Sequence, residues 1–171
     1  SEKLNDFRQD AGRLGIAVIP PSVQTSYRHF ETGENRIYYA LAAIKGVGES
    51  AVDHITEVRG DRPFKSIEDF CLRIDPKQIN RRVMESLISA GAFDCFGIDR
   101  AELVGGLDRI IGYAQRAQEE KVSGQSDFFG SSASAGPEKL ILPPFNPWTP
   151  SEKLMREYQV LGFYLSAHPL D

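Results

Sequence analysis

The sequence predicts a mainly α-helical protein: a tandem helix-hairpin-helix unit with a small β-hairpin, followed by a flexible linker and a C-terminal helix. Three observations predict this fold class. Residues 43–55, AIKGVGESAVDHI, place Gly-Val-Gly between two helix-like segments, and a second helix–glycine–helix pattern surrounds Gly91. Residues 118–147 are rich in Ser, Gly and Pro and lack helical or strand periodicity, as mobile linkers do.

Composition fits one globular domain with appendages, because the chain has 171 residues of which 41% are hydrophobic. No apolar run has the length of a membrane span, and the first residue, Ser1, indicates a piece of a longer protein. Cys71 and Cys95 have no partner at ligand spacing and are interpreted as reduced, buried cysteines of a cytoplasmic protein. A net charge of −4 argues against a strong autonomous nucleic-acid binder.

The N-terminal part combines a helix with extended chain. Apolar spacing predicts a helix over residues 1–14, and Pro20 and Pro21 keep the next stretch extended. Aromatic and β-branched residues on both sides of the T-G-E-N at 32–35 predict the hairpin. After the Gly-Val-Gly, Ser66 and Asp69 have capping-box spacing and predict a helix through Arg73.

Three further helices follow from capping signals. Asp75 as N-cap, with proline next, predicts a helix that ends at Gly91. Asp99 and Glu102 predict the cap of the next helix. Its apolar stripe is Leu103, Leu107, Ile110, Ile111 and Ala114. Thr149 opens the last helix, with the expected apolar stripe Leu154, Met155, Tyr158 and Leu161.

The Gly-Val-Gly turn has the features of an anion site. Amides at Gly46, Val47 and Gly48, and in the first helical turn after them, lack intrahelical acceptors and lie at the positive end of the helix dipole. Glycines let a phosphate oxygen approach the amides, while Val47 anchors the turn in the core. Lys45 and Ser50 flank the turn with a charge and a hydroxyl. This pattern predicts sequence-independent binding of a nucleic-acid backbone.

Other interpretations of the two turns stay open. The first turn can be a tight connection between packed helices with solvated amides. The second turn has a single glycine, Gly91, where two are expected, and Arg81 and Arg82 are either phosphate contacts or a solvated helix face. Residues 36–116 contain twelve Lys or Arg and twelve Asp or Glu, so we expect weak binding in isolation.

Residues 124–130, GQSDFFG, place Phe128 and Phe129 inside the most polar part of the chain. Paired aromatic residues in a flexible segment are typical of a docking peptide, with the rings as anchors and Gln125 at the rim of the partner's pocket. The alternative is that the rings cover a groove of their own domain.

Five segments in order, LGIAVIPPSV, IYYALAAIKGVGESAV, INRRVMESLISAGAFD, GQSDFFG and LGFYLSAHPL, closely resemble the α subunits of bacterial DNA polymerase III, the replicative C-family polymerases. The resemblance covers the chain from end to end. It implies that residues 1–35 end the fingers domain and residues 36–117 form a tandem helix-hairpin-helix domain for duplex DNA. Residues 118–147 are then a flexible linker with a clamp-binding peptide, and residues 148–171 a helix that leads to an OB-fold.

The resemblance also implies roles and partners. The turn at Gly46-Val47-Gly48 grips duplex DNA behind the primer terminus. The sliding clamp, the β subunit, binds the peptide Gln125, Ser126, Asp127, Phe128 and Phe129. Other polymerase III holoenzyme subunits of the cytoplasmic, nucleoid-associated replisome are further partners. The catalytic aspartates and their Mg²⁺ belong to the parent polymerase upstream, so this fragment is expected to be non-catalytic and without a cofactor.

Two other functions compete with this one. A helix-hairpin-helix DNA glycosylase needs a catalytic lysine in the helix after the turn, and ESAVDHITEV contains none. A protein-interaction module whose hairpins only pack fits the docking peptide equally well but has no need of the Gly-Val-Gly. Direct DNA-binding measurements separate these two.

Overall fold

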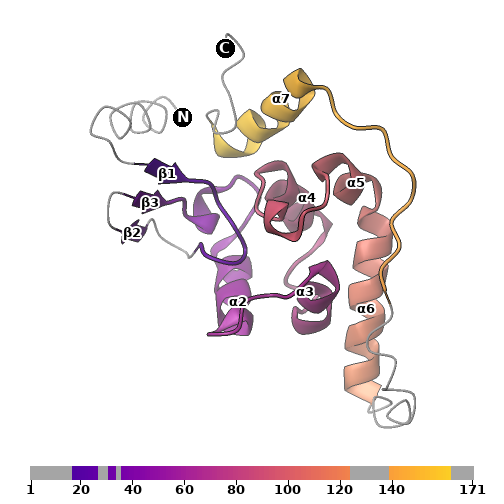
Figure 1. The fold of residues 1–171 in the computed structure, drawn as a ribbon. Coiled ribbons are helices and arrows are strands. Elements are labelled where there is room, and N and C mark those ends of the chain that lie inside the picture. The colour runs from indigo at the N-terminus through magenta and orange to yellow at the C-terminus, as the bar shows by residue number, and fades with distance from the viewer. Residues whose placement is uncertain (1–16, 27–30, 34–35, 124–138, 163–171) are drawn as a thin grey trace.

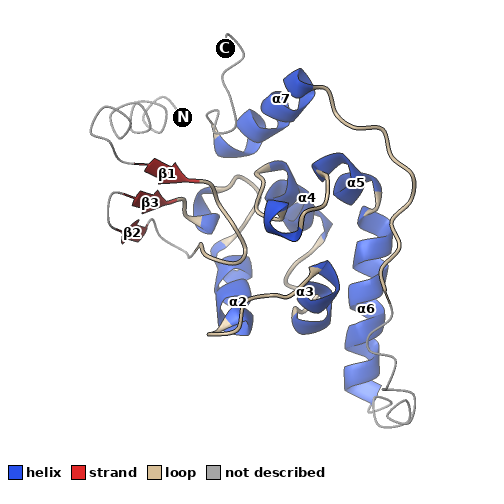
Figure 2. Cartoon of the chain, in the orientation of Figure 1, coloured by secondary structure: helices blue, strands red, loops and turns tan. Residues whose placement is uncertain are grey.

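The computed structural model describes residues 17–26, 31–33, 36–123 and 139–162, and its fold is mainly α-helical, as predicted (Figures 1 and 2). The helical elements are η1 (Leu41–Ala43), α2 (Glu49–Arg59), α3 (Ile67–Arg73), α4 (Arg81–Ser89), η2 (Asp94–Phe96), α5 (Arg100–Gly105), α6 (Leu107–Ser123) and α7 (Pro150–Leu161). In Figure 1, α2 and α6 lie on opposite sides of α3, and α7 crosses above α4.

Three short strands lie at one edge of the helices. They are β1 (Ala17–Ile19), β2 (Glu31–Gly33) and β3 (Arg36–Tyr38), arranged in the order β1-β3-β2. Strands β2 and β3 pair antiparallel with Thr32 opposite Ile37, in the segment where the hairpin was predicted, and the joining residues 34–35 lie outside the described chain. Strand β1 pairs parallel with β3, and no local turn signal in the sequence predicts this long-range pairing.

One hydrophobic core serves both hairpin units. Val52 and Ile55 of α2 are fully buried, and so is Phe70 of α3. The ring of Phe70 makes edge-to-face contacts with Phe64 and with Phe93, each at 4.9 Å between centroids. Because Phe93 follows the second turn, this aromatic chain connects the two units through α3.

The cap of α3 is confirmed, since Ser66 Oγ accepts a hydrogen bond from the Asp69 amide at 3.1 Å. The predicted start of the next helix at Asp75 is wrong. The Asp75 carbonyl closes a single isolated turn, and α4 begins at Arg81. Asn80 is the reason, because its Oδ1 accepts from the Val83 amide at 3.0 Å and provides a second, competing N-cap.

The helix expected after Asp99 is two helices. Asp99 Oδ1 caps α5 by accepting from the Ala101 amide at 2.8 Å, as predicted. The axis breaks at Gly106, where an added Cβ would lie 2.6 Å from Leu142 Cδ2, so the returning chain packs against bare backbone. Helix α6 then continues to Ser123, whereas the sequence predicted a linker from residue 118. The expected N-terminal helix and residues 124–138 lie outside the described chain.

The cap of α7 is confirmed by the hydrogen bond from the Glu152 amide to Thr149 Oγ1 at 3.2 Å. Its predicted apolar stripe is only partly correct. Leu161 is buried, but Met155 and Tyr158 are 53% and 42% exposed, and Glu157 is buried at 1%. The helix therefore directs Glu157 toward the interior, where Arg100 pairs with it.

Candidate nucleic-acid interface

The Gly-Val-Gly turn joins η1 to α2. Gly46 has φ +90°, which favours glycine, and Gly48 is the N-cap of α2 with φ −76° and ψ 160°. Val47 is 5% exposed and anchors the turn in the core, as predicted. The element before the turn is shorter than the predicted helix, because η1 is a single 3₁₀ turn.

The amides of the turn are only partly available to a ligand. The Val47 N–H donates to the Ile44 carbonyl at 3.1 Å, so the expectation of an open amide was wrong at this residue. Among the described residues, the N–H groups of Gly46 and Gly48 make no hydrogen bond, and no side chain caps α2. Open amides at a helix start carry partial positive charge and accept an anion readily.

Helix α4 places a guanidinium group beside the turn. A Cβ added at Gly46 would lie 2.5 Å from Ser86 Oγ and 3.5 Å from Arg82 Nε. Arg82 and Lys45 are exposed, and within the described chain neither is in an ion pair. Ser50, also exposed, lies in the first turn of α2. We refer to this group as the turn site: Lys45, Gly46, Gly48, Ser50 and Arg82.

Two predicted contacts do not join the turn site. Arg81 is paired with Asp108 of α6. Gly91 is buried, its N–H donates to the Ile88 carbonyl at 3.0 Å, and an added Cβ would lie 3.0 Å from Cζ of Arg100. The backbone at Gly91 is thus covered by a guanidinium group and offers no open amide.

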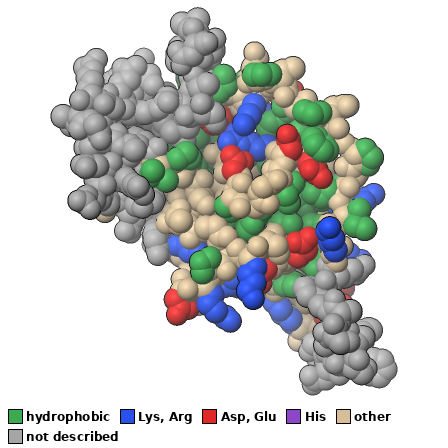
Figure 3. Space-filling model, viewed as in Figure 1, with side chains coloured by type: hydrophobic (Ala, Val, Ile, Leu, Met, Phe, Trp, Pro, Cys, Tyr) green, Lys and Arg blue, Asp and Glu red, His purple; other side chains and the backbone are tan. Residues whose placement is uncertain are grey.

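Acidic side chains on α2 restrict the surface that an anionic ligand can contact. Glu49, Asp53 and Glu57 are exposed and recur at every fourth residue of α2, which places them along one side of the helix. Figure 3 shows Lys and Arg side chains interspersed with Asp and Glu on the face in view rather than gathered in one basic field. An anionic polymer can therefore contact the turn site but is repelled along the rest of α2.

Beside the second turn, an ion pair of Arg100 joins α5 to α7. Arg100 donates to Asp94 Oδ2 at 2.7 Å and to Glu157 Oε2 at 3.0 Å, so the buried glutamate of α7 has its counter-charge here. Burial opposes the charge on Arg100, but the hydrogen bonds and charges of Asp94 and Glu157 outweigh it and raise the pKa of this guanidinium group.

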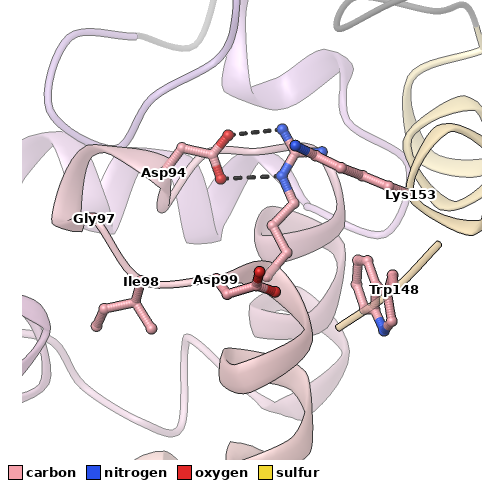
Figure 4. A pocket seen from close by; sticks show the side chains of 7 residues that line it. Asp94, Gly97, Ile98, Asp99, Trp148 and Lys153 are labelled. Carbon is pink, nitrogen blue, oxygen red and sulfur yellow. Dashed lines mark hydrogen bonds and ion pairs between the residues drawn. The ribbon is translucent and has the colours of Figure 1, made fainter. Parts of the chain in front are cut away.

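An open pocket of about 390 Å³ lies beside the second turn, and Figure 4 shows Asp94, Asp99, Trp148 and Lys153 around it. Its carboxylates include the partner of a buried arginine and the N-cap of α5, so they already have structural roles. The second turn is consequently a joint between helices and lacks the open amides of the first.

The cysteines have different environments. Cys71 is buried as predicted, and burial raises the pKa of its thiol to about 12. Cys95 is exposed, so the prediction of burial was wrong there. Over the described residues no group of three His, Cys, Asp or Glu side chains is arranged to hold a metal ion. In the same part of the chain, every helix is too short or too polar to cross a bilayer.

Ser86 is the contact that sequence reasoning missed. It touches the turn from α4, and nothing local marks it as a neighbour of Gly46. The only available signal is its spacing, because Arg82 and Ser86 are four residues apart and share a helix face.

These features, a glycine turn with open amides before a helix and a second turn packed on the same core, define the class of protein. Residues 15–103 match the helix-hairpin-helix motif family, and the chain belongs to that family. Over its length the chain is also similar to subunits named DNA polymerase III subunit alpha. It is 40% identical to that of Caulobacter vibrioides, 37% to that of Campylobacter jejuni and 35% to that of Escherichia coli K12, with 99–100% of the chain covered. The chain spans about 15% of the length of these relatives. The resemblance found in the sequence is thereby confirmed.

Proposed function

We propose that this chain is a non-catalytic segment of a replicative DNA polymerase and that the turn site holds the sugar-phosphate backbone of duplex DNA. One observation carries the proposal: Gly48, the N-cap of α2, offers no side-chain cap, Lys45 and Arg82 lie close to it, and neither cation has an ion-pair partner in the described chain. The family match and the names of the relatives support the same ligand.

The shape of the turn is suited to a phosphate group. A Cβ added at Gly48 meets nothing within 4 Å, so a phosphate oxygen can approach its amide. Lys45 precedes the turn in the sequence and Arg82 lies beside Gly46, so both add positive charge there. Amides and cations contact phosphate oxygens and no base edge, so the binding is independent of sequence. The acidic side of α2 limits the contact to a few phosphates.

We also propose that residues 125–129 dock into a sliding clamp. This proposal is supported by the sequence alone, in which Phe128 and Phe129 follow Gln125 within a Ser- and Gly-rich stretch. Nucleotide transfer, its Mg²⁺ and the contacts with other replisome subunits belong, on this proposal, to the remainder of a longer polypeptide.

A single substitution tests the turn site. Gly48→Asp places a carboxylate at the N-cap, where it accepts hydrogen bonds from the same amides and repels a phosphate. We expect this variant to unfold at the same temperature as the parent chain or higher, because a capped helix is more stable, and to lose most of its affinity for duplex DNA. Fluorescence anisotropy with a labelled duplex measures the affinity.

Gly97→Asp is the matched control. Gly97 has φ +71° and open space around an added Cβ, and aspartate tolerates this conformation better than most residues. It adds the same charge at the second turn, so the comparison removes the effect of net charge. If Gly48→Asp binds duplex as well as Gly97→Asp does, the first hairpin only packs and the protein-interaction module is the better account.

A further inference from the structure

A second cluster of cations lies on α6, away from both turns. Arg109 and Arg116 of α6 and Lys139 of the returning chain line an open pocket of about 260 Å³. All three are exposed, and in the described residues none is in an ion pair. We call these three residues, together with Gly112, which lies between the two arginines on α6, the α6 pocket. In a chain of net charge −4, three cations without carboxylate partners at one place need an explanation.

The α6 pocket is held in shape by the backbone. Arg109 Nη1 donates to the Ile141 carbonyl at 3.0 Å, which fixes the returning chain along α6 and brings Lys139 to the two arginines. Gly112 lies one turn from each arginine, and an added Cβ there would meet nothing within 4 Å. The pocket therefore has an open floor between two guanidinium groups on the same face of the helix.

The spacing of the cations fits a phosphate backbone. Arg109 and Arg116 are seven residues apart, which is about 10 Å along a helix. Neighbouring phosphates of one DNA strand are farther apart than their rise of roughly 3.4 Å along the duplex axis, so two guanidinium groups about 10 Å apart can contact different phosphates of the same backbone. We propose that the α6 pocket is a second phosphate-backbone contact for nucleic acid, separate from the turn site. This rests on the proposed function, because it assigns the same ligand to the chain.

An acidic peptide is the competing occupant, and the lining disfavours it. A peptide needs a concave apolar pocket for its anchor side chain. Ile141 is instead 71% exposed, and Leu140 beside it is partly buried against the core. The pocket thus offers three exposed cations around open space at Gly112, which suit a chain of phosphates.

The test compares variants of the full chain that lose two cations each. The pocket variant is Arg116→Gln with Lys139→Gln, and neither side chain makes a described hydrogen bond. The control is Lys65→Gln with Lys77→Gln, which removes the same charge from exposed sites elsewhere. Binding of a labelled duplex is measured from 50 to 200 mM salt. We expect the pocket variant to bind roughly ten- to a hundredfold more weakly at the lowest salt, with a salt slope shallower by about 2.

Each outcome decides the proposal. Equal affinity of the pocket variant and the control overturns it. If the pocket variant keeps its duplex affinity but loses binding to polyglutamate, the pocket takes an acidic peptide and the proposal is likewise overturned. The Gly48→Asp variant distinguishes the two sites. Loss of affinity there alone supports only the turn site, loss in the pocket variant alone supports only the α6 pocket, and additive losses support both. A parent chain that does not bind duplex at 50 mM salt overturns both.

Discussion

Arg100 Nη1 lies 3.0 Å from Glu157 Oε2, with side chains only 8% and 1% exposed, and this buried pair joins two helices that are far apart in the sequence. Arg100 also binds Asp94 at the second turn. Helix α7, held to α5 by this pair, also carries the Val160 carbonyl that accepts a hydrogen bond from the Lys45 amide at 2.8 Å.

Removal of the arginine should be strongly destabilising. Arg100→Met leaves the buried carboxylate of Glu157 without this counter-charge, and we expect a loss of about 3–5 kcal/mol in the free energy of unfolding, measured with urea. The control, Glu152→Gln, breaks the more exposed pair with Arg156 and should cost less than about 1 kcal/mol. Arg100→Met with Glu157→Met should recover much of the loss, and a double variant as unstable as the single one would contradict this view.

The two glycines of the first turn should respond differently to alanine. Gly46→Ala combines a positive φ with a Cβ placed 2.5 Å from Ser86 Oγ, and strain of this kind costs about 1–3 kcal/mol. Gly48→Ala meets no atom and has an ordinary φ, so we expect a cost below about 1 kcal/mol, from the weaker N-cap. Urea unfolding of both variants checks the difference. Equal costs would mean that Gly46 is not constrained by α4.

The buried thiol predicts a loss of stability in alkaline solution. The pKa of Cys71 is raised from 9.0 to about 12 in the folded chain, so the unfolded chain releases this proton first as the pH rises. The contribution is fully present below pH 9 and is lost between pH 9 and about 12, at up to about 1.4 kcal/mol per pH unit. Cys71→Ala should be less stable at pH 7 but should have a shallower decline from pH 9 to 11. Parallel curves for both proteins would contradict the assignment.

Duplex binding should depend moderately on salt. With only the turn site engaging a few phosphates, as in the pocket variant Arg116→Gln with Lys139→Gln, the slope of log affinity against log salt should be about −2 to −4. Duplexes of different sequence should bind alike, because the proposed contacts are to the backbone. Anisotropy titrations with several duplexes at three salt concentrations measure both quantities. A marked preference among sequences would show that base edges are read.

Binding of residues 125–129 to the sliding clamp should depend on Phe128 and Phe129. Truncation of a buried aromatic anchor costs about 2–4 kcal/mol, so Phe128→Ala with Phe129→Ala should abolish detectable binding to purified clamp. We expect Gln125→Ala to weaken binding less and the melting temperature to stay unchanged in all these variants. If the melting temperature falls by several degrees while clamp binding persists, the rings serve the domain itself.

Local signals in the sequence predicted the helices well where one capping residue was dominant. Ser66, Asp99 and Thr149 each cap the expected helix. The prediction failed where two caps compete, as with Asp75 and Asn80, because sequence alone does not say which one the tertiary structure uses. It also failed at Gly106, since the break follows from contact with Leu142, which comes from a distant part of the chain.

The candidate site was predictable in its glycines and its anchor, Val47, because turn chemistry is local. The contribution of Arg82 rather than Arg81 was not, since the rotation of α4 against the turn decides which of two adjacent arginines faces Gly46. Gly91 resembles a second open turn in the sequence, but the guanidinium group of Arg100, nine residues later, covers it, and such a contact leaves no local signature.

The main-chain hydrogen bond from the Lys45 amide to the Val160 carbonyl affects how this protein can be divided into fragments. A fragment that consists of residues 36–117 alone lacks Val160, the acceptor of that hydrogen bond. The same fragment also lacks Val23, whose amide donates to the Ala92 carbonyl and whose carbonyl accepts from Arg59. A piece that keeps all of these hydrogen bonds therefore spans residues 17–162, in which the flanking segments support the turn site structurally rather than only linking it to other parts of the chain.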